Sequence, residues 1–159
     1  MTAAVRALMA DSVWAGITQH AGTAYPEECC GALWGVPGED GSVVIAGFRP
    51  LRNLASGNPG AGDSRQRSYR TDPRELLELE RECGSLGFTV IGFYHSHPGA
   101  AAALSRRDME GMVPGCVYAV ISVYGHELQD ISDIRLWMKP SVADRPSELK
   151  LELFKETGL

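Results

Sequence analysis

The chain has 159 residues, of which 44% are hydrophobic and 22% are charged, and its formal net charge is −5. These values are typical of one globular domain, over residues 1–159, that buries a single core. The sequence has neither an apolar run of the roughly 20 residues that span a membrane nor a secretory signal at its start, so we expect a cytoplasmic protein without membrane association.

The first fifty residues predict a helix followed by a β-hairpin. Apolar residues recur at near-helical spacing over 4–20, which predicts a helix that ends before Gly22. The apolar run 28–36 and the segment 42–48 predict two strands. Between them lies the turn 37–41, rich in glycine and acidic residues, so the two strands should pair as a hairpin.

The middle of the chain predicts a long loop and then a helix. Residues 50–70 are rich in Gly, Asn, Ser and Arg, and a loop of this length is often a binding loop. Asp72 should cap the next helix, Pro73 should occupy its first position, and Gly84 should end it. Arginines crowd this region and could form a local basic patch despite the acidic total: Arg49, Arg52, Arg65, Arg67, Arg70 and Arg74.

The second half alternates predicted strands with one short helix. Strands are predicted over 88–95, 117–124, 131–138 and 147–154, the last from its strict alternation of Leu with charged residues. Ser105 should cap a helix from Arg106 to about residue 112. The fold class is therefore α/β, with a mixed central sheet and helices packed on it.

The four cysteines form no disulfide framework and no CxxC pair. We interpret them as small buried apolar residues. Cys29 and Cys30 are neighbours, so in a strand they would point to opposite faces and would not both bind one metal ion.

The segment His95-Ser96-His97-Pro98 carries the strongest chemical signal. Two histidines at i and i+2 of a strand point to the same face, where both imidazoles could bind one cation. Asp108, in the first turn of the next helix, could bring a carboxylate to the same point. Two His and one carboxylate leave an open zinc position, which is typical of a catalytic site rather than a closed structural one.

A catalytic metal needs a general base beside it, and Glu28 is the best candidate because it leads into an apolar strand. Its neighbour Glu27 would face the other way. Each residue also has an ordinary interpretation: Ser105 and Asp108 match a helix capping box, and a lone histidine or glutamate is most often structural or solvated. The joint pattern favours the metal site.

Together these motifs resemble the JAMM motif of the MPN-domain (Mov34/PAD-1) metallopeptidases, in its compact prokaryotic form. The resemblance rests on His95-Ser96-His97, seven intervening residues, Ser105 to Asp108, the upstream segment 26–31, and Tyr69 to Pro73. It implies the deaminase-like MPN fold, with Zn²⁺ bound by His95, His97 and Asp108. It also implies Glu28 as the acid/base and Ser105 as a residue that holds the oxyanion.

The resemblance also implies a substrate: the peptide or isopeptide bond after the C-terminal Gly-Gly of a ubiquitin-like or sulfur-carrier protein. One position departs from the family, because Leu104 stands where proline often precedes the motif serine, and this bears on the rigidity of the loop. Arg65, Arg67 and Arg70 could meet an acidic face of the carrier or could simply be solvated.

Three other functions compete with this one. Base deamination expects H-x-E and P-C-x-x-C, and the sequence has neither. An MPN-fold interaction module without catalysis is the main alternative, although such modules as a rule lack the full ligand set. A nucleic-acid-binding protein using the arginine-rich loop is disfavoured by the net charge, and the sequence does not indicate an oligomeric state.

Overall fold

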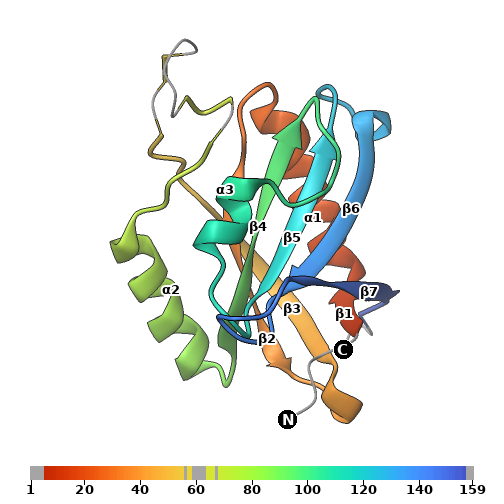
Figure 1. The fold of residues 1–159 in the computed structure, drawn as a ribbon. Coiled ribbons are helices and arrows are strands. Elements are labelled where there is room, and N and C mark those ends of the chain that lie inside the picture. Colours follow the sequence, from red (N-terminus) through yellow and green to blue (C-terminus); the bar gives the residue numbers. More distant parts are fainter. Residues whose placement is uncertain (1–5, 56, 59–63, 67, 157–159) are drawn as a thin grey trace.

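The computed structural model describes residues 6–55, 57–58, 64–66 and 68–156, and these form one closed barrel with helices packed around it (Figure 1). Its strands are β1 (Arg6–Ala10), β2 (Cys30–Pro37), β3 (Val43–Leu51), β4 (Thr89–Pro98), β5 (Val117–Val123), β6 (Ile131–Met138) and β7 (Ser147–Phe154). The helices are α1 (Asp11–Ala24), α2 (Pro73–Ser85) and α3 (Arg106–Gly111), with short 3-10 turns η1 (Glu39–Gly41) and η2 (Leu128–Asp130). None of these helices is long and apolar enough to cross a membrane.

The strand order around the barrel is β1-β3-β2-β4-β5-β6-β7. Strand β1 runs parallel to both β3 and β7, and β4 runs parallel to β5, whereas the other neighbours are antiparallel. The sheet is therefore mixed, which confirms the predicted α/β class. In the parallel pair β4–β5, the carboxyl end of β4 carries both histidines.

The prediction of a helix over 4–20 is wrong at both ends. Residues 6–10 form β1, in which Ala7 and Met9 are fully buried at a spacing of two, and the helix begins only at Asp11. Pairing with β3 and β7, which lie far along the chain, decides this segment. Gly22 does not end the helix: a side chain there would lie 2.7 Å from the carbonyl oxygen of His126, so this glycine permits close packing.

The other predicted elements are found with small shifts. The hairpin is the antiparallel pair β2–β3. Helix α2 begins after Asp72, whose side chain accepts a hydrogen bond from the N–H of Arg74 at 2.9 Å. The helix continues past Gly84 to Ser85, and the left-handed residue that follows it is Gly87, at φ +82°. Strand β4 extends three residues beyond the predicted His95, to Pro98, so both histidines lie in regular strand geometry.

Two apolar clusters lie on opposite sides of the sheet. The larger joins the buried face of α1, including Val13 and Ile17, to the strands, and the smaller joins α2, through Leu79 and Cys83, to β2. Figure 1 shows α1 behind the sheet and α3 in front of it. Cys29 belongs to the larger cluster and Cys30 to the smaller, so they point to opposite faces as predicted. All four cysteines are free.

Candidate metal centre and catalytic site

The two histidines lie on one face at the end of β4, as their spacing predicts. The Nε2 atoms of His95 and His97 are 3.1 Å apart. The intervening Ser96 points away: its hydroxyl accepts a hydrogen bond from the N–H of Cys29 at 2.8 Å, and its own N–H donates to the Cys29 carbonyl at 3.1 Å. Ser96 therefore fastens the segment that carries Glu28 to the strand that carries the histidines.

Asp108 completes the cluster from the first turn of α3. Its Oδ1 lies 3.1 Å from Nε2 of His95, and its Oδ2 lies 3.0 Å from Nε2 of His97. The same carboxylate accepts the N–H of Ser105 at 2.8 Å, while the Ser105 hydroxyl accepts the N–H of Asp108 at 3.0 Å. The capping interpretation is confirmed, and the carboxylate that caps the helix also faces the two imidazoles.

Glu28 lies beside the histidines, directly before β2, and is only 7% exposed. Its carboxylate and the donor nitrogens of His95 and His97 all lie within 4.8 Å of one another. Asp108 makes the shorter contacts with both rings, so it is the better third ligand, and Glu28 is the adjacent group. The neighbouring Glu27 faces solvent and pairs with Arg65 at 3.3 Å, as its predicted orientation requires.

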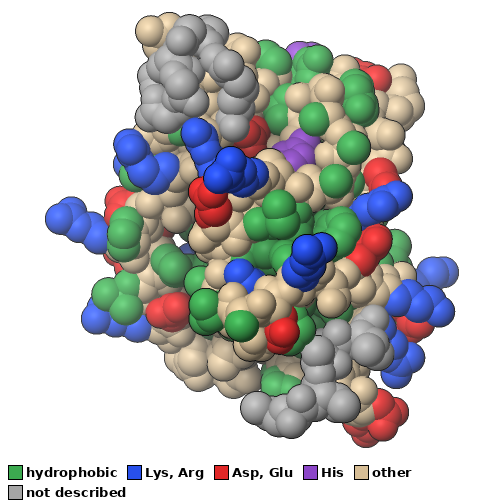
Figure 2. Space-filling view, viewed as in Figure 1, with side chains coloured by type: hydrophobic (Ala, Val, Ile, Leu, Met, Phe, Trp, Pro, Cys, Tyr) green, Lys and Arg blue, Asp and Glu red, His purple; other side chains and the backbone are tan. Residues whose placement is uncertain are grey.

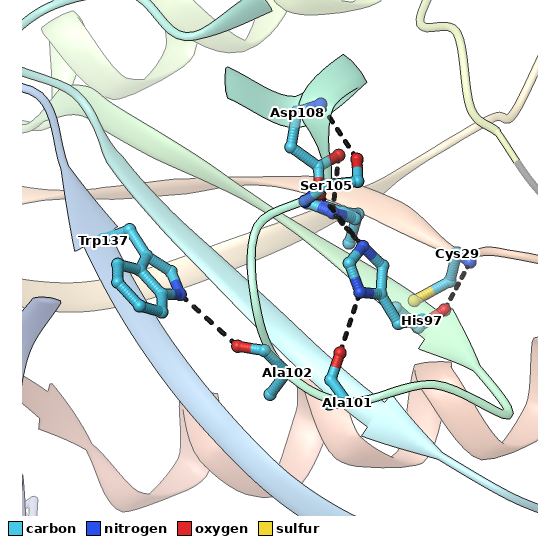
Figure 3. A network of polar contacts seen from close by, with 9 residues as sticks. Cys29, His97, Ala101, Ala102, Ser105, Asp108 and Trp137 are labelled. Carbon is cyan, nitrogen blue, oxygen red and sulfur yellow. Dashed lines mark hydrogen bonds and ion pairs between the residues drawn. The ribbon is translucent and has the colours of Figure 1, made fainter. Parts of the chain in front are cut away.

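Three side chains anchor the loop between β4 and α3, and Figure 3 shows two of these bonds, from His97 to Ala101 and from Trp137 to Ala102. The carbonyls of Ala100, Ala101 and Ala102 accept hydrogen bonds from Ser122, His97 and Trp137, at 2.5, 2.9 and 3.4 Å. These bonds supply anchoring in a loop that has Leu104 in place of the usual proline. The bond to Ala101 also sets the tautomer of the neutral His97 ring: a carbonyl can only accept, so Nδ1 carries a hydrogen. Whenever the ring is neutral, its lone pair therefore lies at Nε2.

Burial and the mutual contacts perturb the pKa of each group. Burial raises the pKa of Glu28 to about 7, with Asp108 adding to the shift and His97 and Arg107 opposing it. Burial lowers the pKa of His95, so this ring is neutral. For Asp108, the hydrogen bonds with His95 and His97 outweigh burial and hold its pKa well below the usual range. Burial alone would lower the pKa of His97, but its hydrogen bonds to Asp108 and Ala101 outweigh burial and raise the pKa.

The donor set fits a zinc ion. Zinc binds imidazole nitrogen and carboxylate oxygen at about 2.0–2.2 Å, and tetrahedral angles then place neighbouring donors roughly 3.3 Å apart. The contacts among His95, His97 and Asp108 are 3.0–3.1 Å, close to that spacing. Zinc requires neutral imidazoles and a deprotonated carboxylate as ligands, and His95, His97 and Asp108 can supply these forms.

The site lies at one end of an open cleft of about 670 Å³. Its walls come from the segment 68–71, the loop after β4 and the first turns of α3; Ala100, Ala101 and Ala103 make one wall small and apolar. Figure 2 shows histidine, acidic and basic side chains gathered on this face. The expectation that the 50–70 and 98–104 loops flank the site agrees with this lining.

The arginines of the middle segment have partners within the chain. Arg65 pairs with Glu27, and the Arg70 guanidinium donates to the Leu54 carbonyl at 2.9 Å. Arg67 lies outside the described residues. Arg65 and Arg70 thus each have a contact within the chain, and a contact with an acidic face of a carrier stays a prediction. In α3, Arg106 pairs with Glu110, while Arg107 lines the cleft.

Sequence reasoning missed two residues that support the site. Tyr69 stacks on His95, with ring centroids 4.8 Å apart and planes 27° from parallel. Nδ1 of His95 is buried and has no hydrogen-bond partner among the described residues, so the stacked ring is a main restraint on its orientation. Asn53 makes four hydrogen bonds around the same segment. Tyr69 was named only as part of the segment Tyr69 to Pro73 that resembles the family, without a role. The only signal of Asn53 was an Asn in a loop with little apolar content.

Comparison with known proteins agrees with this geometry. A sequence model of the family described as prokaryotic homologues of the JAB domain matches residues 10–138. The chain is 30% identical over 116 residues to a desampylase of Haloferax volcanii, an alignment covering 72% of this chain and 76% of that protein. It is 30% identical over 132 residues to a CysO-cysteine peptidase of Mycobacterium tuberculosis, covering 80% and 82%.

Solved structures are similar over nearly the whole length. A protein from Desulfitobacterium hafniense, known from a solution structure, superposes with a TM-score of 0.76 at 25% identity and covers 94% of both chains. A protein from Salinibacter ruber gives a TM-score of 0.63 at 25% identity, over 91% of this chain and 90% of that one. The matched segment contains the clustered histidines and Asp108, and the chain belongs to the JAMM/MPN family, among the prokaryotic homologues of the JAB domain.

Proposed function

We propose that this chain is a zinc-dependent peptidase of the JAMM type. The observation that carries the proposal is the convergence of His95, His97 and Asp108, which contact one another at 3.0–3.1 Å with Glu28 beside them. His95, His97 and Asp108 would hold the ion, and a bound zinc ion would act as a Lewis acid toward the scissile carbonyl. The relatives that are a desampylase and a CysO-cysteine peptidase support hydrolysis as the reaction class.

Glu28 would move the proton in this reaction. Its raised pKa, at about 7, lies near neutral pH, where a carboxylate can both accept a proton from an attacking water and deliver it to the leaving amine. Ser105 would donate to the developing oxyanion. Its oxygen already accepts the N–H of Asp108, and no acceptor for its hydroxyl hydrogen is found among the described residues, so the hydrogen is free to point into the cleft.

The substrate we propose is the peptide or isopeptide bond after the C-terminal Gly-Gly of a ubiquitin-like protein, with a sulfur carrier as the favoured class. The small alanine side chains along one wall of the cleft support it, because they leave room for an extended glycine backbone to approach closely. We expect the protein to act in the cytoplasm and to bind neither nucleic acid nor a membrane.

The decisive experiment incubates the zinc-loaded protein with ubiquitin-like carriers, each extended beyond its terminal Gly-Gly, and reads the products by intact mass. We expect release of the extension at the glycine, and no release by Glu28→Gln. Stoichiometric zinc without cleavage of any carrier would instead favour an interaction module that has the MPN fold but no catalytic activity.

A further inference from the structure

Asn53 uses every hydrogen-bonding position of its side chain. Its Nδ2 donates to the carbonyls of Glu28 at 3.1 Å and Ser68 at 3.0 Å. Its Oδ1 accepts the N–H groups of Ala55 at 3.0 Å and Arg70 at 3.1 Å. An asparagine amide has two N–H donors and one oxygen with two lone pairs, so this side chain is fully satisfied at one place.

These four bonds connect the two halves of the site. Ser68 and Arg70 flank Tyr69, the residue that stacks on His95, so Asn53 holds the backbone on both sides of that aromatic ring. Through the Glu28 carbonyl, Asn53 also holds the residue beside the histidine pair. The Glu28 N–H donates to the Arg65 carbonyl at 2.5 Å, so both backbone groups of Glu28 bind the same loop.

The loop needs such a connection because it has little apolar surface to bury. Among the described residues between Arg52 and Ser68, the buried ones are Ala55, Ser64 and Ser68, and small side chains of this kind contribute little hydrophobic stabilisation. Its position relative to Glu28 must therefore come mainly from hydrogen bonds, which hold geometry more narrowly than apolar contacts do.

We propose that Asn53 is a positioning residue for this site. It fixes Glu28 and Tyr69 in one unit, so that the Glu28 carboxylate faces the histidine pair and Tyr69 orients His95. The role in catalysis rests on the proposed function above, whereas the role in orienting His95 does not depend on any substrate.

Two substitutions separate the donor and acceptor arms of the side chain. Asn53→Asp keeps the shape and the oxygen that accepts from Ala55 and Arg70, but it turns a second oxygen toward the carbonyls of Glu28 and Ser68, where the oxygens repel. Asn53→Ala removes all four bonds. Gln129→Glu is the matched control, because it makes the same amide-to-carboxylate change at an exposed position away from the loop.

Amide hydrogen exchange, followed by NMR at pH 8, tests the bonds without any substrate. We expect the N–H groups of Ala55 and Arg70 to exchange at least about tenfold faster in Asn53→Ala, and to stay protected in Asn53→Asp. Zn²⁺ titration against a chromophoric chelator tests the link to His95. The dissociation constant should rise by roughly tenfold in Asn53→Ala, as for other partners that orient metal ligands, and should not change in Gln129→Glu.

Turnover of a Gly-Gly-extended carrier tests the link to Glu28. We expect kcat to fall by about 10- to 100-fold in Asn53→Asp while KM changes by less than about threefold, because a displaced base affects the chemical step. A merely structural role would lower the melting temperature and the folded fraction but leave kcat per folded, zinc-bound molecule unchanged.

Each result decides the proposal. Unchanged exchange in Asn53→Ala would overturn the hydrogen-bond assignment, and equal kcat in Asn53→Asp and Gln129→Glu would overturn the positioning of Glu28. If the wild-type protein cleaves no carrier, the proposed function fails. The positioning role is then decided by the metal titration, where an unchanged Zn²⁺ dissociation constant in Asn53→Ala would overturn it.

Discussion

Glu28 should destabilise the metal-free fold at neutral and alkaline pH, and Glu28→Gln should relieve this. The pKa of Glu28 rises from an ordinary 4.5 to about 7 because the residue is buried. The folded state therefore holds a proton that the unfolded chain has already lost between these two values. Stability from this group is present at low pH and is lost as the pH rises from 4.5 through 7.

The magnitude follows from the shift. A difference of 2.5 pKa units, from 7 − 4.5, corresponds to about 3 kcal/mol at 1.36 kcal/mol per unit. Ionisation of Glu28 should therefore lower the free energy of unfolding by most of this amount at pH 8, but by only about 1 kcal/mol at pH 5. The free energy of unfolding of Glu28→Gln, relative to that of the wild type, should thus increase by roughly 2 kcal/mol from pH 5 to pH 8. For a chain of this size, this corresponds to about 4–8 °C in melting temperature.

The assay is urea and thermal unfolding of chelator-treated protein from pH 5 to pH 8. The difference between the two proteins isolates Glu28, because the histidines and Asp108 titrate in both. Glu27→Gln is the matched control: this neighbour pairs with Arg65 in solvent, so its loss should change the free energy of unfolding by under about 1 kcal/mol. A Glu28→Gln protein less stable than the wild type at pH 8, or a difference independent of pH, would refute the reasoning.

Four further outcomes are expected. Glu28→Gln should keep zinc but lose about 10²- to 10⁴-fold in turnover; full turnover by intact mass would exclude it as the base. His97→Ala should lose both zinc and turnover, and a chelator should no longer lower its melting temperature; elemental analysis showing full zinc content would contradict the ligand set. Ser105→Ala should lower the free energy of unfolding by about 1 kcal/mol, because the helix cap is lost, and should lower kcat by roughly 10²-fold. Denaturation and steady-state kinetics measure the two effects, and an unchanged kcat would mean that Ser105 acts only as the cap. Ser122→Ala removes the bond to Ala100, so zinc titration should show weaker binding, and an unchanged affinity would mean that the loop needs no such anchor.

Local rules predicted the centre of the site. The period of two in a strand was enough to place His95 and His97 on one face, and they are found there at 3.1 Å. The capping pattern placed Asp108 in a first helical turn, which fixes its direction relative to the strand end. Both are short-range features in which the sequence determines geometry within a few residues.

Non-local contacts were beyond this reasoning. Strand β1 has apolar residues that fit either period, and its pairing with β3 and β7 decides the outcome. The contacts of Asn53 and Tyr69 join a loop without periodicity to residues on other elements. No spacing rule specifies which carbonyl an asparagine in such a loop will reach or which ring a tyrosine will stack on, so these contacts become visible only in the structure.

The shared use of the Asp108 carboxylate explains how so short a helix can carry a ligand. Helix α3 has six residues, fewer than an isolated helix needs to be stable, so its position depends on its contacts. The cap with Ser105 fixes the rotamer of Asp108 before any ion binds, and the two imidazoles hold the carboxylate from the other side. The capping interpretation and the metal interpretation are therefore compatible with one arrangement, in which the bonds that begin the helix would also preorganise the proposed ligand.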